Sequence, residues 1–162
     1  MTLDAINHLD HAAAEAEFVR CCGSAAWARA MAAARPFASV DAMAGAGDAI
    51  WRSLTPVDWL EAFAAHPKIG EQARTSWSAR EQAGMQAADG GVRHRLAAGN
   101  TEYQSRFGYI FIICATGKTA ADMLAALEAR LSNDPAVELR VASEEQRKIA
   151  RLRLAKLMDG DS

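Results

Sequence analysis

The chain has 162 residues, of which 51% are hydrophobic and 23% are charged, and its formal net charge is −2. This length suits one domain with a sizeable core, so we expect a single domain over residues 1–162. The composition is that of an ordinary soluble globular protein, and the nearly balanced charge argues against a nucleic-acid partner.

The cysteines and the apolar runs bear on the cellular location of the protein. Cys21 and Cys22 are adjacent, Cys114 stands alone, and no CxxC pair exists. An odd number of cysteines without such a pair fits a reducing compartment. The N-terminal residues do not have the pattern of a signal peptide, and the longest apolar run, 109–115, is too short to span a bilayer. We therefore expect a cytoplasmic protein with no membrane partner.

In chain order, the first half of the sequence predicts a series of helices. Abundant alanine and only four prolines favour helical structure. Apolar residues at helical spacing predict helices over 1–12 and 13–22. Ser24 and Ser39 are suitable N-caps for two further helices, and Thr55 followed by Pro56 is typical of the start of another.

The stretch that follows Pro56 ends with the sequence WLEAFAAHPKIGE and predicts an amphipathic helix that stops at a histidine. Pro67 disfavours the helical conformation of the residue before it, so the helix should end near His66. The negative end of the helix dipole would favour a protonated imidazole there. The alternative is an ordinary capping histidine. The apolar residues expected to face the core are Trp59, Leu60, Phe63 and Ala64.

The second half of the sequence predicts more helices and one extended segment. A capping box formed by Ser78 and Glu81 begins a helix, and another helix over 92–107 is broken by Gly108. The strand-like run 109–115 has no partner strand, so we expect an extended connector. Helices starting at Thr119 and covering 135–158 complete the chain. The predicted fold is all-α, a single bundle of about eight helices with one short extended connector near 109–115.

Several polar groups outside the core could carry chemistry. Ser78 and Glu81, with Gln82 beside them, form one cluster: the first two share a helix face and could reach one ligand, although a capping box explains them equally well. Gly108 permits close backbone approach, and the unpaired amides after it need an acceptor, which a ligand, neighbouring helix ends or water could supply. Arg153 lies between two leucines, where a guanidinium should have a partner such as a carboxylate.

Other catalytic classes find little support in the sequence. No G-x-S-x-G, HExxH, P-loop or Rossmann pattern is present. His8 and His11 are spaced for a shared ligand, but no third metal ligand stands near them, and we expect surface histidines. Covalent catalysis and a metal site are therefore not expected.

Five motifs together resemble those of a known enzyme family. In chain order they read AHPKIG, SAREQAG, N-x-x-Y-x-x-x-FGYIFII, LxxRLSND and EQRKIARLRLAKL. This combination is similar to the decarboxylases that act on 2-oxo-4-hydroxy-4-carboxy-5-ureidoimidazoline (OHCU) in urate degradation. The resemblance runs over nearly the whole chain. It implies an all-helical lyase without a cofactor, usually a homodimer, that converts OHCU, its small-molecule partner, to (S)-allantoin and carbon dioxide.

The resemblance also implies roles for particular residues. The family's catalytic histidine corresponds to His66 and its glutamate to Glu81. Arg153 corresponds to its substrate arginine, with Arg151 as the alternative. Lys68 departs mildly from the pattern, since the family more often has arginine there. The other substrate-binding positions are Pro67, Ser78, Gln82, Gly108, Tyr109, Ile110, Phe111 and Ile112.

Two other functions remain open from the residues themselves. The chain could be a non-catalytic helical interaction module, in which the His66–Pro67 break and Gly108 only shape the fold. It could also be another cofactor-free lyase or hydrolase that acts on a ring ureide.

Overall fold

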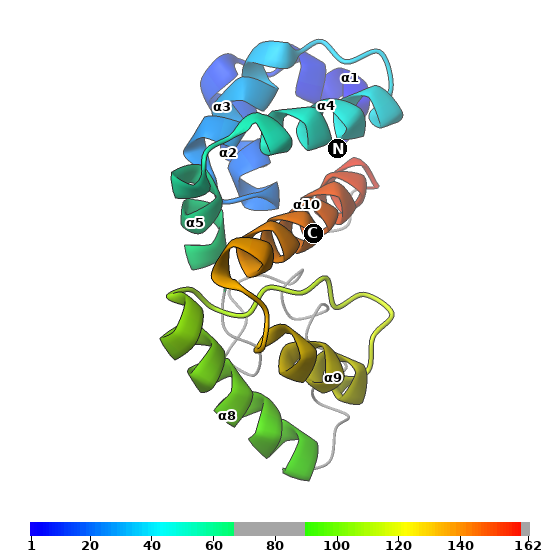
Figure 1. Cartoon of the computed structure of the whole chain (residues 1–162). Coiled ribbons are helices and arrows are strands. Elements are labelled where there is room, and N and C mark those ends of the chain that lie inside the picture. Colours follow the sequence, from blue (N-terminus) through cyan, green and yellow to red (C-terminus); the bar gives the residue numbers. More distant parts are fainter. Residues whose placement is uncertain (67–89, 160–162) are drawn as a thin grey trace. The chain divides into compact units, whose positions relative to one another are not determined.

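The computed structural model describes residues 1–66 and 90–159. Within these residues the secondary structure is entirely helical (Figure 1), which confirms the predicted all-α class. No helix of this described part is both long and apolar enough to cross a membrane. The helices are α1 (Leu3–His8), α2 (His11–Cys21), α3 (Ala25–Ala34), α4 (Val40–Ser53), α5 (Pro56–Ala64), α8 (Gly90–Phe107), α9 (Ala120–Arg130) and α10 (Pro135–Met158).

Local capping explains most helix starts, and it corrects one predicted boundary. Ser24 and Ser39 cap α3 and α4, as expected, through side-chain oxygens that accept from Trp27 N and Ala42 N. The predicted helix over 1–12 is wrong in extent, because α1 ends at His8 and the side chain of Asp10 begins a new helix. A carboxylate is a favourable N-cap, and this one interrupts the apolar spacing that suggested one longer helix.

The chain divides into two compact units, one made of Met1–Ala65 with Gln146–Ser162 and the other of His66–Glu145. The first unit has an aromatic core. Phe18 meets Trp27 edge to face at a centroid separation of 6.2 Å, and Trp27 Nε1 donates to the Gly47 carbonyl at 3.0 Å. Gly47 leaves little room for a larger residue, since a Cβ would lie only 3.3 Å from both Trp27 and Leu154. Helices α3, α4 and α10 are thus packed closely around this core.

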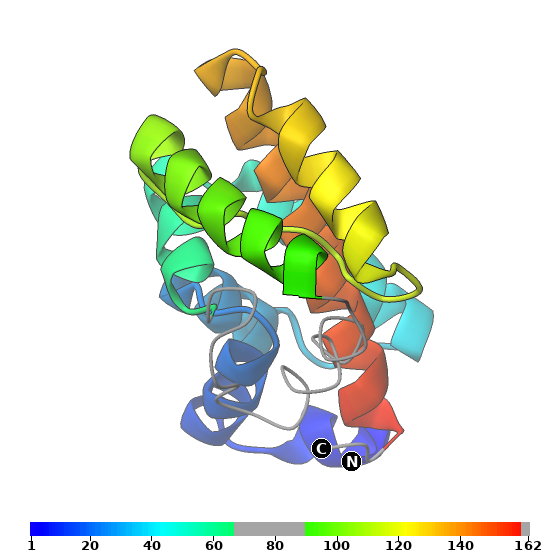
Figure 2. The same ribbon diagram turned by 90° about the horizontal axis from the view of Figure 1, so that it is seen from below.

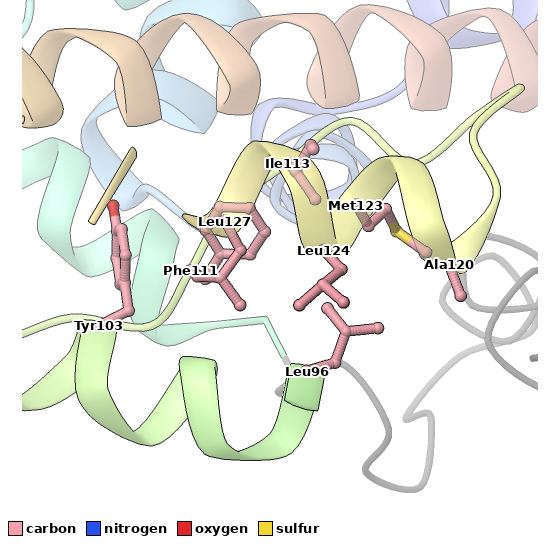
Figure 3. Packing of buried hydrophobic residues seen from close by; sticks show 8 residues of the cluster. All are labelled: Leu96, Tyr103, Phe111, Ile113, Ala120, Met123, Leu124 and Leu127. Carbon is pink, nitrogen blue, oxygen red and sulfur yellow. The ribbon is translucent and has the colours of Figure 1, made fainter. Parts of the chain in front are cut away.

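The second unit is built on α8 and α9, which lie side by side in both Figure 1 and Figure 2. Gly99 allows this approach, because a Cβ there would lie 2.6 Å from Leu127. The connector between the two helices adds side chains to the same core (Figure 3). The buried residues of this cluster are Leu96, Tyr103, Phe111, Ile113, Ala120, Met123, Leu124 and Leu127.

Candidate active site

The predicted site residues are distributed over the described and undescribed parts of the chain. His66 is the last described residue after α5, and it is half-buried in a bend. Arg153 belongs to the first unit and 108–112 to the second, so each is described within its own unit. Pro67, Ser78, Glu81 and Gln82 lie outside the described residues.

The helix that leads to His66 begins and ends where the sequence predicts. Pro56 is its first residue, and the N–H of Thr55 donates to Asp58 Oδ2 at 3.3 Å. The helix ends at Ala64, two residues before His66. Its buried face is narrower than expected, because Phe63 is buried whereas Leu60, at 40% exposure, and Ala64 are exposed.

The end of α5 is held against the turn between α2 and α3. A Cβ on Gly23 would lie 2.4 Å from the Cβ of Ala65, so only glycine fits there. Glu61 Oε1 accepts from the N–H of Ala25 at 2.8 Å and satisfies an open donor of α3. Because Ala65 directly precedes His66, this contact restrains the position of the backbone at His66.

Arg153 and Arg151 have different surroundings on α10. Arg153 is buried, at 8% exposure, whereas the Arg151 side chain is 44% exposed and its Nη1 lies 2.6 Å from Asp48 Oδ2. Burial raises the pKa of the Cys21 and Cys22 thiols to about 12, and the nearby positive charge of Arg153 opposes that rise. The guanidinium of Arg153 therefore lies inside the first unit, close to the end of α2.

The segment after α8 is extended, as predicted, and its conformation is fixed by contacts at both ends. Gly108 has φ of +86°, a backbone conformation that favours glycine, and its N–H still donates to the Gln104 carbonyl. Farther along, Glu145 Oε1 accepts from the N–H of Cys114 at 3.1 Å, and Lys118 Nζ donates to the Cys114 carbonyl at 2.9 Å.

The middle of this connector presents backbone donors. Among the residues that the structure describes, no group accepts a hydrogen bond from the N–H of Ile110 or of Phe111. Buried backbone donors are rarely left unpaired in proteins, and Phe111 is 3% exposed. A ligand with carbonyl or carboxylate oxygens would satisfy these two amides.

Sequence reasoning did not single out two residues that shape these segments. Gly23 follows the helix predicted over 13–22, and nothing local in the sequence indicates its contact with Ala65. Arg130 lies in the LxxRLSND motif, yet its contact with the connector carbonyl of Ile112, at 2.7 Å, depends on the packing of α9. The presence of an arginine within an otherwise apolar helix stripe was the available signal.

Comparison with known proteins identifies the family. Residues 7–155 match the family model described as OHCU decarboxylase. The chain belongs to the OHCU decarboxylase family. The match runs from α1 to the last turns of α10, so it includes His66, the connector and Arg153.

Individual members of the OHCU decarboxylase family show how closely the chain is related. It is 37% identical to 2-oxo-4-hydroxy-4-carboxy-5-ureidoimidazoline decarboxylase of Amia calva, over 78% of this chain and 77% of that protein. It is 42% identical to the uric acid degradation bifunctional protein TTL of Arabidopsis thaliana, over 88% of this chain, and spans 47% of that protein. A crystal structure of OHCU decarboxylase in the presence of (S)-allantoin superposes with a TM-score of 0.80 at 40% identity, covering 88% of this chain and 97% of that one.

Proposed function

We propose that this protein is a carboxy-lyase that converts OHCU to (S)-allantoin and carbon dioxide in urate degradation, without a cofactor. The observation that carries the proposal is the family match over residues 7–155, which spans both units of the chain. For the same reason we propose that the two units work as one domain. A homodimer and a cytoplasmic location follow from the resemblance and the sequence, and belong to the same proposal.

The substrate supplies much of the chemistry. The bond between the ring carbon and the carboxylate breaks, carbon dioxide leaves, and the electron pair passes into the adjacent imine-type bond of the ring, whose nitrogen takes up a proton from the solvent. The hydroxyl on the same carbon loses its proton and becomes the ring carbonyl. A proton then adds to the neighbouring carbon that carries the ureido group, on one face, and gives (S)-allantoin. Because the ring itself takes up the electrons, the protein has to supply orientation, charge stabilisation and a proton.

His66 is suited to the proton transfer. An imidazole changes its protonation state near neutral pH, so it takes the hydroxyl proton as a base and returns a proton to carbon as an acid. Its place after α5 supports this assignment, because the contact between Gly23 and Ala65 limits where the His66 backbone can lie. Glu81 is proposed to orient the imidazole and maintain the correct tautomer.

Substrate binding is assigned to two kinds of donor. Arg153, with its buried guanidinium, and Gln82 would hold the carboxylate, ring carbonyl or ureido group. The amides of Ile110 and Phe111 would donate to the ring oxygens. Pro67, Ser78 and the main chain of Gly108, Tyr109 and Ile112 are the other proposed substrate-binding positions.

The decisive experiment follows (S)-allantoin by its circular dichroism while OHCU is generated freshly from urate. The wild-type protein should accelerate the appearance of the chiral product. His66→Asn should lower kcat by about 10²–10⁴-fold, the contribution of one positioned acid–base group, with the helical spectrum unchanged. His94→Asn, the same change at an exposed site on α8, is the matched control and should keep full activity. Near-normal turnover by His66→Asn would refute the assigned role.

A further inference from the structure

The second unit contains a buried ion pair that the proposed chemistry does not use. Arg130, at the end of α9, and Glu138, in the first turn of α10, are 8% and 0% exposed. Arg130 Nη2 lies 2.6 Å from Glu138 Oε2, and Arg130 Nε lies 2.9 Å from the same oxygen. The two-pronged geometry fixes the plane of the guanidinium as well as its position.

Glu138 is held in turn by two more side chains. The Tyr103 hydroxyl of α8 donates to Glu138 Oε2, and Asn133 Nδ2 donates to Oε1 at 3.0 Å. Burial and the neighbouring carboxylate raise the pKa of Tyr103 above its ordinary value, so its hydroxyl keeps its proton. The two carboxylate oxygens of Glu138 thus accept hydrogen bonds from three residues in all: Arg130, Tyr103 and Asn133. We call Arg130, Glu138, Tyr103 and Asn133 the Arg130 cluster.

The side of the Arg130 guanidinium that does not contact Glu138 faces the connector. Arg130 Nη1 donates to the Ile112 carbonyl at 2.7 Å, and the guanidinium carbon lies 4.5 Å from the centroid of the Phe111 ring. Arg130 therefore contacts two consecutive connector residues, one through the main chain and one through the side chain. The hydrogen bond to Ile112 holds the main chain of the connector between Gly108 and Cys114.

This geometry determines where neighbouring amides point. A peptide unit is planar, so holding the Ile112 carbonyl fixes the unit that joins Ile112 to Ile113. Contact with the Phe111 ring restrains the preceding residue. With both held, few backbone rotations remain for the N–H groups of Ile110 and Phe111, which are the proposed substrate donors.

Stability alone is a weak explanation for such a pair. A buried ion pair loses much of its attraction to the cost of removing both charges from water, and well-packed apolar replacements are often as stable. What apolar side chains cannot replace is a charged donor directed at the Ile112 carbonyl. The arrangement is therefore better suited to orienting the connector than to adding stability.

We propose that Arg130 is a positioning residue for the decarboxylase, which holds the amides of Ile110 and Phe111 in the direction of the substrate's ring oxygens. The proposal rests on the proposed function. Glu138, Tyr103 and Asn133 act through Arg130 by fixing its guanidinium. Since the ring oxygens are present in substrate and product alike, the cluster should affect binding of both more than it affects the chemical step.

The test compares Arg130→Lys with a matched surface variant, Arg95→Gln. Arg95 pairs with Glu128 and also joins α8 to α9, but both side chains are largely exposed. A lysine ammonium is a compact charge without the planar fork of a guanidinium, so Arg130→Lys cannot keep both the two-pronged contact with Glu138 and the hydrogen bond to the Ile112 carbonyl in their present geometry. Loss of one or two oriented hydrogen bonds should raise the KM for OHCU and the Kd for (S)-allantoin by about tenfold. The value of kcat should change by less, and Arg95→Gln should match the wild type.

A second variant separates positioning from folding. Arg130→Met with Glu138→Gln removes the connector contact without leaving a lone buried charge, and the new amide still accepts from Tyr103. Backbone hydrogen exchange across 108–114, which requires no substrate, should be faster in both Arg130 variants than in Arg95→Gln.

The outcomes distinguish this proposal from the proposed function. Folded Arg130 variants with wild-type KM and exchange rates would overturn the positioning role, as would a loss confined to kcat. Failure of both Arg130 variants to fold would assign the cluster to stability alone and also overturn it. If the wild type and Arg95→Gln do not turn over OHCU, the proposed function fails. In that case hydrogen exchange across 108–114 still tests the effect of Arg130 on the connector. Exchange in the Arg130 variants equal to that in Arg95→Gln would reject the effect, and faster exchange would support it.

Discussion

Replacing Gly23 with alanine should displace the end of α5 and, with it, His66. The added Cβ would lie 2.4 Å from the Cβ of Ala65, whereas carbon atoms pack at about 3.5–4.0 Å. The two segments must therefore separate by about 1 Å. The backbone itself is not strained by the change, because Gly23 is not among the glycines with positive φ.

The cost follows from two opposing effects. Forcing an extra methyl group into a packed contact costs about 1–3 kcal/mol. Replacing glycine lowers the entropy of the unfolded chain, which offsets about 0.4–1 kcal/mol. The free energy of unfolding should fall by roughly 1–2 kcal/mol, which for a chain of this size lowers Tm by about 3–6 °C.

The assay measures thermal unfolding and OHCU turnover on the same preparations. A displacement of about 1 Å at a catalytic group costs up to 10²-fold, so kcat should fall more than stability alone explains. Gly45→Ala is the matched control, since a Cβ at that exposed helical position meets nothing within 4 Å. It should gain about 0.5–1 kcal/mol and keep its activity. If Gly23→Ala behaves like Gly45→Ala in both measurements, the contact with Ala65 does not position His66.

Two further predictions concern the first unit. Arg153→Lys should raise the KM for OHCU by about tenfold with a smaller change in kcat, because an ammonium cannot make a two-pronged contact, and an unchanged KM would count against the assignment. The Cys21 and Cys22 thiols titrate near 12 when folded and near the ordinary 9.0 when unfolded, so the stability they contribute is complete below pH 9 and is lost as pH rises toward 12. Each thiol should lower the free energy of unfolding, measured by urea unfolding, by ~1.4 kcal/mol per pH unit above pH 9. The double variant Cys21→Ala with Cys22→Ala should lose this pH dependence. Equal slopes in the wild type and the double variant would contradict the prediction.

The candidate site was predictable from the sequence only in part. The helix end near His66 and the extended connector after Gly108 were predicted correctly, and both have local causes in a following proline and in a glycine of positive φ. The roles of His66, Glu81 and Arg153 came from the resemblance and remain predictions.

Two predictions failed where the deciding contact was not visible in the apolar spacing. The helix expected over 1–12 ends at His8, because the Asp10 side chain binds the next helix start. Leu60 and Ala64 were expected to face the core, but Leu60 is 40% exposed and Ala64 is exposed too, because the packed face of α5 centres on Ala62 and Phe63. Periodicity shows that a helix has an apolar face, but the neighbouring elements decide how wide that face is.

The sequence by itself determined the helical class and the position of the break at His66. Caps, prolines and glycines act within one helical turn, so their effect does not depend on the rest of the fold. Only the tertiary structure decided that Arg153 is buried while Arg151 pairs with Asp48, and that Arg130 reaches the Ile112 carbonyl. These contacts join residues 18 to 103 positions apart, and packing of whole helices, which no local pattern encodes, brings them together.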